Sequence, residues 1–189
     1  MKALLTLSCL LMAGFTHLTY AQDLLASHEF EARDISEVSL KGVFCDVYAE
    51  PGDMLKFKGR IEGRGKEGDY RIESRLVGDR VEIWVDSRGG RGWNNRTSLS
   101  KLEIQVPKGI YVRLQTTSGD IFARGLDGKE LSVSSTSGDI ELSDMFGPLE
   151  VTCTSGDVEL DDVNGPLDVR TTSGDIEVSG IKGESEVGS

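Results

Sequence analysis

Histidine and cysteine are scarce in this chain of 189 residues, which has only two histidines and three cysteines. One histidine (His28) and two cysteines (Cys45 and Cys153) lie after residue 21. No serine, cysteine or carboxylate has a base that the sequence places beside it, so these residues supply no catalytic constellation. The chain is therefore predicted not to be an enzyme and to need no cofactor.

The two cysteines after residue 21 are predicted to stay unpaired. The repeat described below places Cys45 and Cys153 several β-layers apart, and neighbouring layers are separated by ~4.8 Å. A disulfide needs its two Cα atoms within about 7 Å of each other. We therefore expect two separate, buried thiols.

Apolar runs long enough to cross a membrane are missing as well. The longest run near the start, Ala3–Phe15, has 13 residues, whereas a ~30 Å hydrocarbon core needs about 20. With small residues in Thr19-Tyr20-Ala21, the segment 1–21 is typical of a secretory signal peptide that is cleaved before Gln22. The chain is expected to be exported to the periplasm, the outer-membrane surface or the extracellular space, with no membrane span after cleavage.

A surplus of basic residues is also absent. Residues 22–116 hold 16 basic and 16 acidic side chains, whereas residues 117–189 hold 4 basic and 16 acidic ones and carry a net charge of −12. Binding to nucleic acid or anionic lipid requires a basic face. This composition disfavours both, and it leaves cations, basic proteins and neutral glycans as partner classes.

What the sequence does have is a repeat. The motif Thr-Ser-Gly-Asp-Ile/Val occurs four times, with its aspartates 19, 18 and 18 residues apart. Five apolar positions recur behind each motif, with polar residues between them, which predicts two short strands per repeat with apolar side chains inward. The five columns are Ile121, Ile140, Val158 and Ile176; Ala123, Leu142, Leu160 and Val178; Leu126, Met145, Val163 and Ile181; Leu131, Leu149, Leu167 and Ser185; and Val133, Val151, Val169 and Val187.

The repeat predicts an all-β fold: a single-stranded, right-handed parallel β-helix, or solenoid, with rungs of 18–19 residues and irregular N-terminal strands. One rung cannot bury its own apolar face, so neighbouring rungs must cover it. Recurring glycines and β-branched residues argue against helices. A degenerate rung is expected 19 residues upstream, with Leu102 and Ile104 beside the first two columns and Val112 and Leu114 beside the last two.

Three segments follow from these patterns. Residues 1–21 are the signal peptide, residues 22–33 an N-terminal segment, and residues 34–189 the β-solenoid. Within the solenoid, residues 34–100 form irregular strands with a loop at 87–100, and residues 101–189 form the regular rungs. The early strand-like runs are either irregular rungs or an antiparallel cap, and both alternatives place them in one continuous β body.

The run Leu102-Glu103-Ile104-Gln105-Val106-Pro107, followed by serial Ser-Gly-Asp-Ile/Val strands, resembles the bacterial adhesin-like domain of unknown function. That group is related to proposed auto-transporter adhesin head domains. The resemblance covers roughly residues 34–189. It implies a parallel β-helix in the periplasm or on the cell surface, and it carries no catalytic residues over to this chain.

The aspartate column allows two interpretations. In the favoured one it is a structural turn ladder, in which each carboxylate accepts an N–H of its own turn and so offsets the repulsion between rungs. In the other it binds calcium with help from Asp144, Asp161 and Asp162, although the nine-residue repeat of calcium-binding β-rolls is absent. The ladder residues are Gly119, Asp120, Gly138, Asp139, Gly156, Asp157, Gly174 and Asp175.

A second candidate site is the loop segment Trp93-Asn94-Asn95, where an aromatic ring beside two amides suits a sugar, or where Trp93 packs back onto the body. The preferred function is a non-catalytic, exported, adhesin-like interaction protein that presents an acidic face to protein or glycan partners. One alternative is a structural or regulatory envelope component that self-associates end to end, through an unpaired last rung, or docks to a membrane partner. Another is a carbohydrate-active enzyme.

Overall fold

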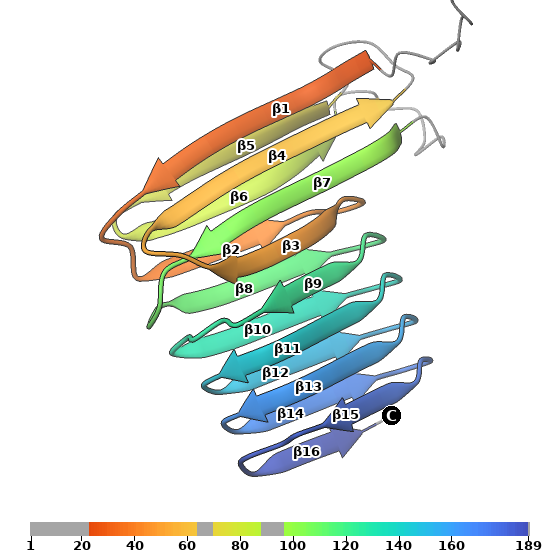
Figure 1. Ribbon diagram of the computed structural model, residues 1–189. Helices are drawn as coiled ribbons and strands as arrows, with labels where there is room; N and C mark the ends of the chain where they lie inside the picture. Colours follow the sequence, from red (N-terminus) through yellow and green to blue (C-terminus); the bar gives the residue numbers. More distant parts are fainter. Residues whose placement is uncertain (1–22, 64–69, 88–96, 189) are drawn as a thin grey trace, which may run out of the picture.

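The computed structural model describes residues 23–63, 70–87 and 97–188, and every regular element in these ranges is a β-strand. The strands form two eight-stranded sheets packed face to face (Figure 1). Sheet A contains, in spatial order, β1 (Asp23–Ala32), β4 (Leu55–Gly63), β7 (Thr97–Val106), β3 (Asp46–Pro51), β9 (Ile121–Arg124), β11 (Ile140–Phe146), β13 (Val158–Asn164) and β15 (Ile176–Ser179). Sheet B contains β5 (Tyr70–Val77), β6 (Arg80–Ser87), β2 (Glu37–Lys41), β8 (Tyr111–Thr116), β10 (Glu130–Ser135), β12 (Leu149–Cys153), β14 (Leu167–Thr171) and β16 (Ser185–Gly188).

The C-terminal half is a regular stack in which the chain alternates between the two sheets. Along sheet B, Leu131 pairs with Leu149 and Leu149 with Leu167, all in parallel register. The predicted apolar columns point between the sheets and are buried from β8 to β14, as the period-two alternation requires. Burial then declines in the last rung, where Val187 is 51% exposed. The predicted all-β, solenoid-like architecture is confirmed, and the handedness of the coil stays a prediction.

An inserted rung separates the regular stack from what precedes it in the sequence. The rung β2–β3 lies between β8–β9 on one side and β6–β7 on the other. Val38 pairs with Val112, and Val47 pairs with Ile121. The prediction for residues 102–114 was therefore half right: β8 pairs with β10 as expected, but β7 pairs with β3, because the inserted rung occupies the place beside β9.

The other early strands run antiparallel and close the opposite end of the stack. β4 pairs antiparallel with both β1 and β7, and β5 pairs antiparallel with β6. The sheets are thus mixed and not wholly parallel, and the early chain combines irregular rungs with an antiparallel cap. β1 also brings residues 23–32 into the β body, upstream of the expected boundary at residue 34.

Both cysteines outside the signal segment are free and buried, as predicted. Cys45 lies in the β2–β3 rung and Cys153 ends β12, with the β8–β9 and β10–β11 rungs between them. Within the described ranges, the structure has no helix of the length and apolarity that a membrane crossing requires.

Candidate functional site

The four corners with the Thr-Ser-Gly-Asp motif stack directly on one another. A Cβ atom on Gly138 would lie 2.0 Å from the carbonyl oxygen of Gly119, and one on Gly174 would lie equally close to that of Gly156. Such a distance is far inside van der Waals contact, so glycine is required for the rungs to approach. The glycines of the ladder therefore act in backbone packing between neighbouring corners.

The aspartates link each corner to the next rung. Asp139 Oδ1 accepts the N–H of Asp157 at 2.9 Å, and Asp157 Oδ1 accepts the N–H of Asp175 at the same distance. The expected acceptor role within one turn belongs to other side chains, such as Ser135 Oγ, which accepts the N–H of Gly138 at 2.9 Å. The reason is the stacking, which places the next rung's N–H over each carboxylate.

The ladder has a fifth member, Asp46, which the sequence analysis missed. Its Oδ1 accepts the N–H of Asp120 at 3.2 Å, because the inserted rung stacks on the first regular corner. The signal was present in the spacing: Val38 precedes Val47 by nine residues, as Val112 precedes Ile121. Aligning the chain with itself at that larger offset pairs Asp46-Val47 with Asp120-Ile121.

The aspartates do not converge with the other carboxylates that were weighed for calcium. Asp144 pairs with Arg124 at 3.0 Å, and Asp161 accepts a hydrogen bond from Ser179. Among the described residues, no three carboxylate, histidine or cysteine side chains are arranged to hold a metal ion. The segment Trp93-Asn94-Asn95 lies outside the described residues, so its sugar-binding role stays a prediction.

One Ser–His pair exists that sequence reasoning did not place. His28 Nε2 lies 2.7 Å from Ser74 Oγ, and the two residues join β1 to β5 across the antiparallel end of the stack. A triad would need a carboxylate on the other ring nitrogen, and within the described ranges His28 has no such partner. The pair closes the end of the core, where the imidazole also packs 6.2 Å from the Phe57 ring.

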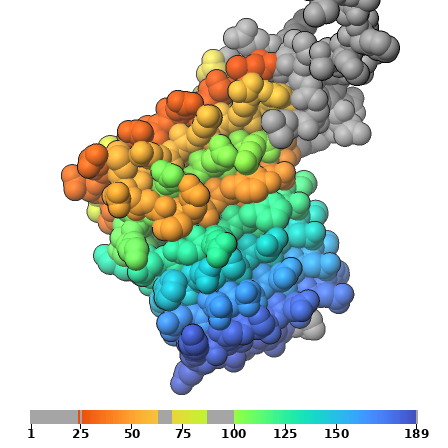
Figure 2. Space-filling view, viewed as in Figure 1, coloured from red at the N-terminus to blue at the C-terminus, as the bar shows by residue number. Residues whose placement is uncertain are grey.

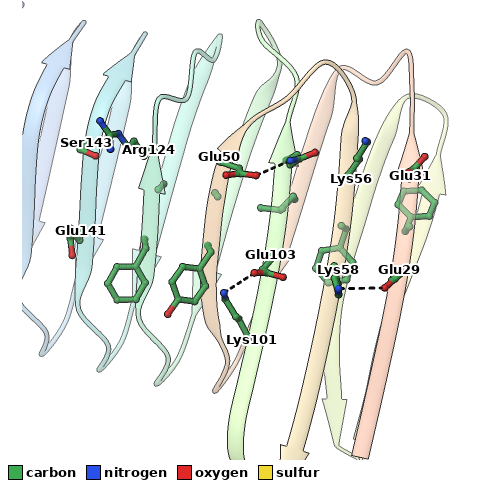
Figure 3. A pocket seen from close by; sticks show the side chains of 18 residues that line it. Glu29, Glu31, Glu50, Lys56, Lys58, Lys101, Glu103, Arg124, Glu141 and Ser143 are labelled. Carbon is green, nitrogen blue, oxygen red and sulfur yellow. Dashed lines mark hydrogen bonds and ion pairs between the residues drawn. The ribbon is translucent and has the colours of Figure 1, made fainter. Parts of the chain in front are cut away.

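A groove crosses the outer face of sheet A over β1, β4, β7, β3, β9 and β11, and it has a volume of about 770 Å³. Each strand contributes two outward side chains that are two residues apart, and these form two rows across the strands (Figure 3). The backbone of the residues between the rows, such as Ala49 and Ala123, forms the floor. Figure 2 shows the same face, with the strands of the groove in orange to green and the acidic rungs in blue.

Two aromatic rings stand at the centre of the first row. Tyr48 on β3 pairs in register with Phe122 on β9, and the nearly parallel rings lie 5.0 Å apart between centroids. Lys101 Nζ sits 4.3 Å from the centroid of the Tyr48 ring and 2.7 Å from Glu103 Oε1. This hydrogen bond to Glu103 is the main cause that raises the pKa of Lys101 above its ordinary value, so its ammonium stays charged.

The second row is polar throughout. Gln105 Nε2 donates to Glu50 Oε1 at 2.8 Å, and Arg124 follows Glu50 along the row. Lys56 and Ser143 extend the row toward its two ends (Figure 3). The groove thus sets carboxylate, amide, ammonium and guanidinium groups opposite an aromatic pair.

The fold, not the local sequence, brings this site together. Tyr48 and Phe122 are 74 residues apart in the chain and become neighbours only through the inserted rung. The strands beneath the groove pair laterally with one another, which fixes the spacing of the two rows. Each aromatic residue alone is an outward position on a strand, and for that reason sequence reasoning did not single it out.

Comparison with known proteins identifies the fold. The sequence profile described as Toastrack DUF4097 matches residues 45–188. No curated protein matches the chain.

Solved structures give a likeness in fold. A provisionally named cell adhesion protein from Clostridium sporogenes has a TM-score of 0.51 and 11% identity, with 86% of this chain and 98% of that chain covered. A provisionally named adhesin from Bacteroides fragilis has a TM-score of 0.37 and 12% identity, covering 88% and 96%. A provisionally named lipid binding protein from Parabacteroides distasonis has a TM-score of 0.29 and 15% identity, covering 86% and 95%.

Proposed function

The chain belongs to the Toastrack DUF4097 family, and on that premise we propose that it is an exported, adhesin-like interaction protein without catalytic activity. Its binding site is the groove on the outer face of sheet A. The observation that carries this proposal is the pair Tyr48 and Phe122, an aromatic surface at the centre of an open groove on paired strands. A groove with an aromatic surface and a few placed polar groups is typical of a ligand site.

The construction of the groove favours binding over turnover. Its walls come from side chains on strands that are hydrogen-bonded to their neighbours, so the site is formed before any partner arrives. In the described part of the chain, no serine or cysteine in the groove is hydrogen-bonded to a histidine. The fold shared with the protein from Clostridium sporogenes, which bears a cell-adhesion name, supports the same role.

The acidic rungs have a supporting role in this proposal. Glu141, Glu159 and Glu177 form one outward column on sheet A, and the repulsion between them keeps the exposed rungs solvated. Export through the segment 1–21 remains part of the proposal. End-to-end association and docking to a membrane partner stay predictions.

The proposal is tested by adhesion of beads coated with residues 22–189 to whole bacteria and to isolated envelope. The double variant Tyr48→Ala/Phe122→Ala is expected to reduce bead retention about tenfold, since each aromatic contact contributes ~0.5–1.5 kcal/mol. The matched control is Tyr111→Ala, which removes an exposed aromatic ring from the outer face of sheet B. Equal retention for all three proteins, or turnover of any envelope polymer by the wild type, would overturn the proposal.

A further inference from the structure

The groove has a definite length and direction. It crosses six adjacent strands at right angles to them, and five strand spacings of ~4.8 Å give a length of about 24 Å. The two rows of side chains bound it on its long sides (Figure 3). This shape suits an extended, linear molecule better than a compact one.

The charges along the groove nearly cancel. Four cationic and five anionic side chains line it, and several are paired with each other, as Lys101 is with Glu103 at 2.7 Å and Lys58 with Glu29 at 4.0 Å. Opposite charges so close together leave little net field over the groove. The charge pattern therefore favours a neutral ligand over a polyanion or a polycation.

The two rows offer different chemistry at the centre. Tyr48 and Phe122 offer apolar ring surface, and Glu50, Gln105 and Arg124 opposite them offer hydrogen-bond donors and acceptors. A sugar ring has the matching character, with C–H groups on its faces and hydroxyls around its edge. Toward the ends, Glu31, Lys56, Glu141 and Ser143 have no hydrogen-bond or ion-pair partner among the described residues, and they can bond to further hydroxyls.

Peptide recognition fits this groove less well. A peptide that adds a strand needs a free sheet edge, but β4, β7, β3 and β9 are each paired on both sides. An amphipathic helix needs a broad apolar groove, and here the apolar surface is limited to two rings in one row. A proline-rich peptide needs aromatic residues along its groove, whereas the second row has none.

We propose that the groove binds a linear, neutral glycan across the strands of sheet A, with a central sugar between Tyr48–Phe122 and Glu50–Arg124. This inference rests on the proposed function and names the class of ligand that the site takes. The sugars on either side lie over β7 and β4 in one direction and over β11 in the other.

The test is isothermal titration of residues 22–189 with linear neutral oligosaccharides of two to six sugars. The probes are β-1,4-linked N-acetylglucosamine, β-1,4-linked glucose, α-1,4-linked glucose and β-1,4-linked mannose. At least one series is expected to bind, with affinity that rises with length up to the span of the groove. Raising the salt from 50 to 500 mM is expected to change that affinity less than twofold, because a neutral ligand releases no counterions.

Charged relatives of the first series test the charge argument. Fully deacetylated glucosamine oligomers are cationic, and hyaluronate fragments are anionic, so both are expected to bind at least tenfold more weakly than the neutral series. The double variant Tyr48→Ala/Phe122→Ala is expected to bind the neutral glycan at least tenfold more weakly, and Tyr111→Ala to bind it as the wild type does. Thermal unfolding of each variant verifies that the fold is retained.

The outcomes separate this inference from the proposed function. If no neutral series binds, if a charged series binds more tightly, or if only a proline-rich peptide competes for the groove, the glycan assignment is wrong. Adhesion that still depends on Tyr48 and Phe122 then leaves the proposed function standing. If adhesion itself ignores the double variant, both the function and the glycan assignment fail.

Discussion

The same corner is built in two ways in the two halves of the molecule. In the regular half it is Thr-Ser-Gly-Asp, and in the inserted rung the equivalent stretch is Gly42-Val43-Phe44-Cys45-Asp46, since Lys41 pairs with Gln115 and Val47 with Ile121. The regular corner depends on glycine because another corner stacks against it. The inserted corner tolerates Cys45 at that position because the rung beyond it joins β6 to β7 through the longer segment 88–96 and not through the same tight turn.

The inserted corner is held by its backbone. Val43 has a φ of 57°, which is unfavourable for a β-branched residue, and its carbonyl oxygen accepts the N–H groups of Thr117 at 2.7 Å and Ser118 at 2.8 Å. These bonds fix the inserted rung to the first regular corner. The comparison indicates that backbone contacts define the stack throughout, and that outward positions are free to differ between the acidic half and the groove.

The largest expected effect tests the requirement for glycine in the regular corners. Gly138→Ala places a Cβ 2.0 Å from the Gly119 carbonyl oxygen, so the rungs must separate, and we expect a loss of about 3 kcal/mol or more in the free energy of unfolding. Urea denaturation measures it. The matched control is Gly188→Ala, where the new Cβ meets nothing within 4 Å. A loss for Gly138→Ala as small as that of the control would contradict the close-stacking account.

An intermediate effect tests whether the aspartates act as acceptors between rungs. Asp139→Ala leaves the N–H of Asp157 without its acceptor at 2.9 Å and is expected to cost about 1–3 kcal/mol of unfolding free energy. Asp139→Asn keeps the acceptor oxygen and removes one charge from the column, so its stability is expected to equal or exceed that of the wild type. Added calcium is expected to leave the melting temperature unchanged. Stabilisation by calcium that Asp139→Asn abolishes would instead favour the metal interpretation.

The smallest expected effect concerns the cysteine of the inserted corner. Burial, with the negative charge of Asp46, raises the pKa of Cys45 from 9.0 to about 12. Above about pH 9 the unfolded chain therefore loses the thiol proton while the folded chain keeps it, and stability falls as pH rises.

Denaturation of the wild type and of Cys45→Ala at pH 7, 9 and 10 isolates this contribution. The stability difference in favour of the wild type should shrink by up to about 1.4 kcal/mol per pH unit above pH 9. In the native state at pH 8, Cys45 should resist thiol reagents, because the reactive thiolate is scarce. Rapid labelling of the folded protein, or a stability difference that does not depend on pH, would show that the thiol is accessible.

The regular half was predictable from sequence because its contacts repeat at a short, constant distance. The columns that include Leu131, Leu149 and Leu167 follow from alternation and repetition alone, and they fold as expected. The early strands were not assigned, because their pairing joins distant segments such as Val38 and Val112, and propensity cannot select among such partners. The groove was missed for the same reason, since Tyr48 and Phe122 meet only across that pairing.

The place of β2–β3 between β6–β7 and β8–β9 also sets an order of assembly. Both neighbours of Val38, namely Val81 and Val112, come later in the chain, so a polypeptide emerging from its N-terminus must hold this segment without partners until residues 80–124 have followed. Joining ends so far apart is the slow kind of step in folding. The C-terminal layers, by contrast, can each settle on a finished neighbour as they appear, so the earliest-made half of the molecule sets its pace of maturation.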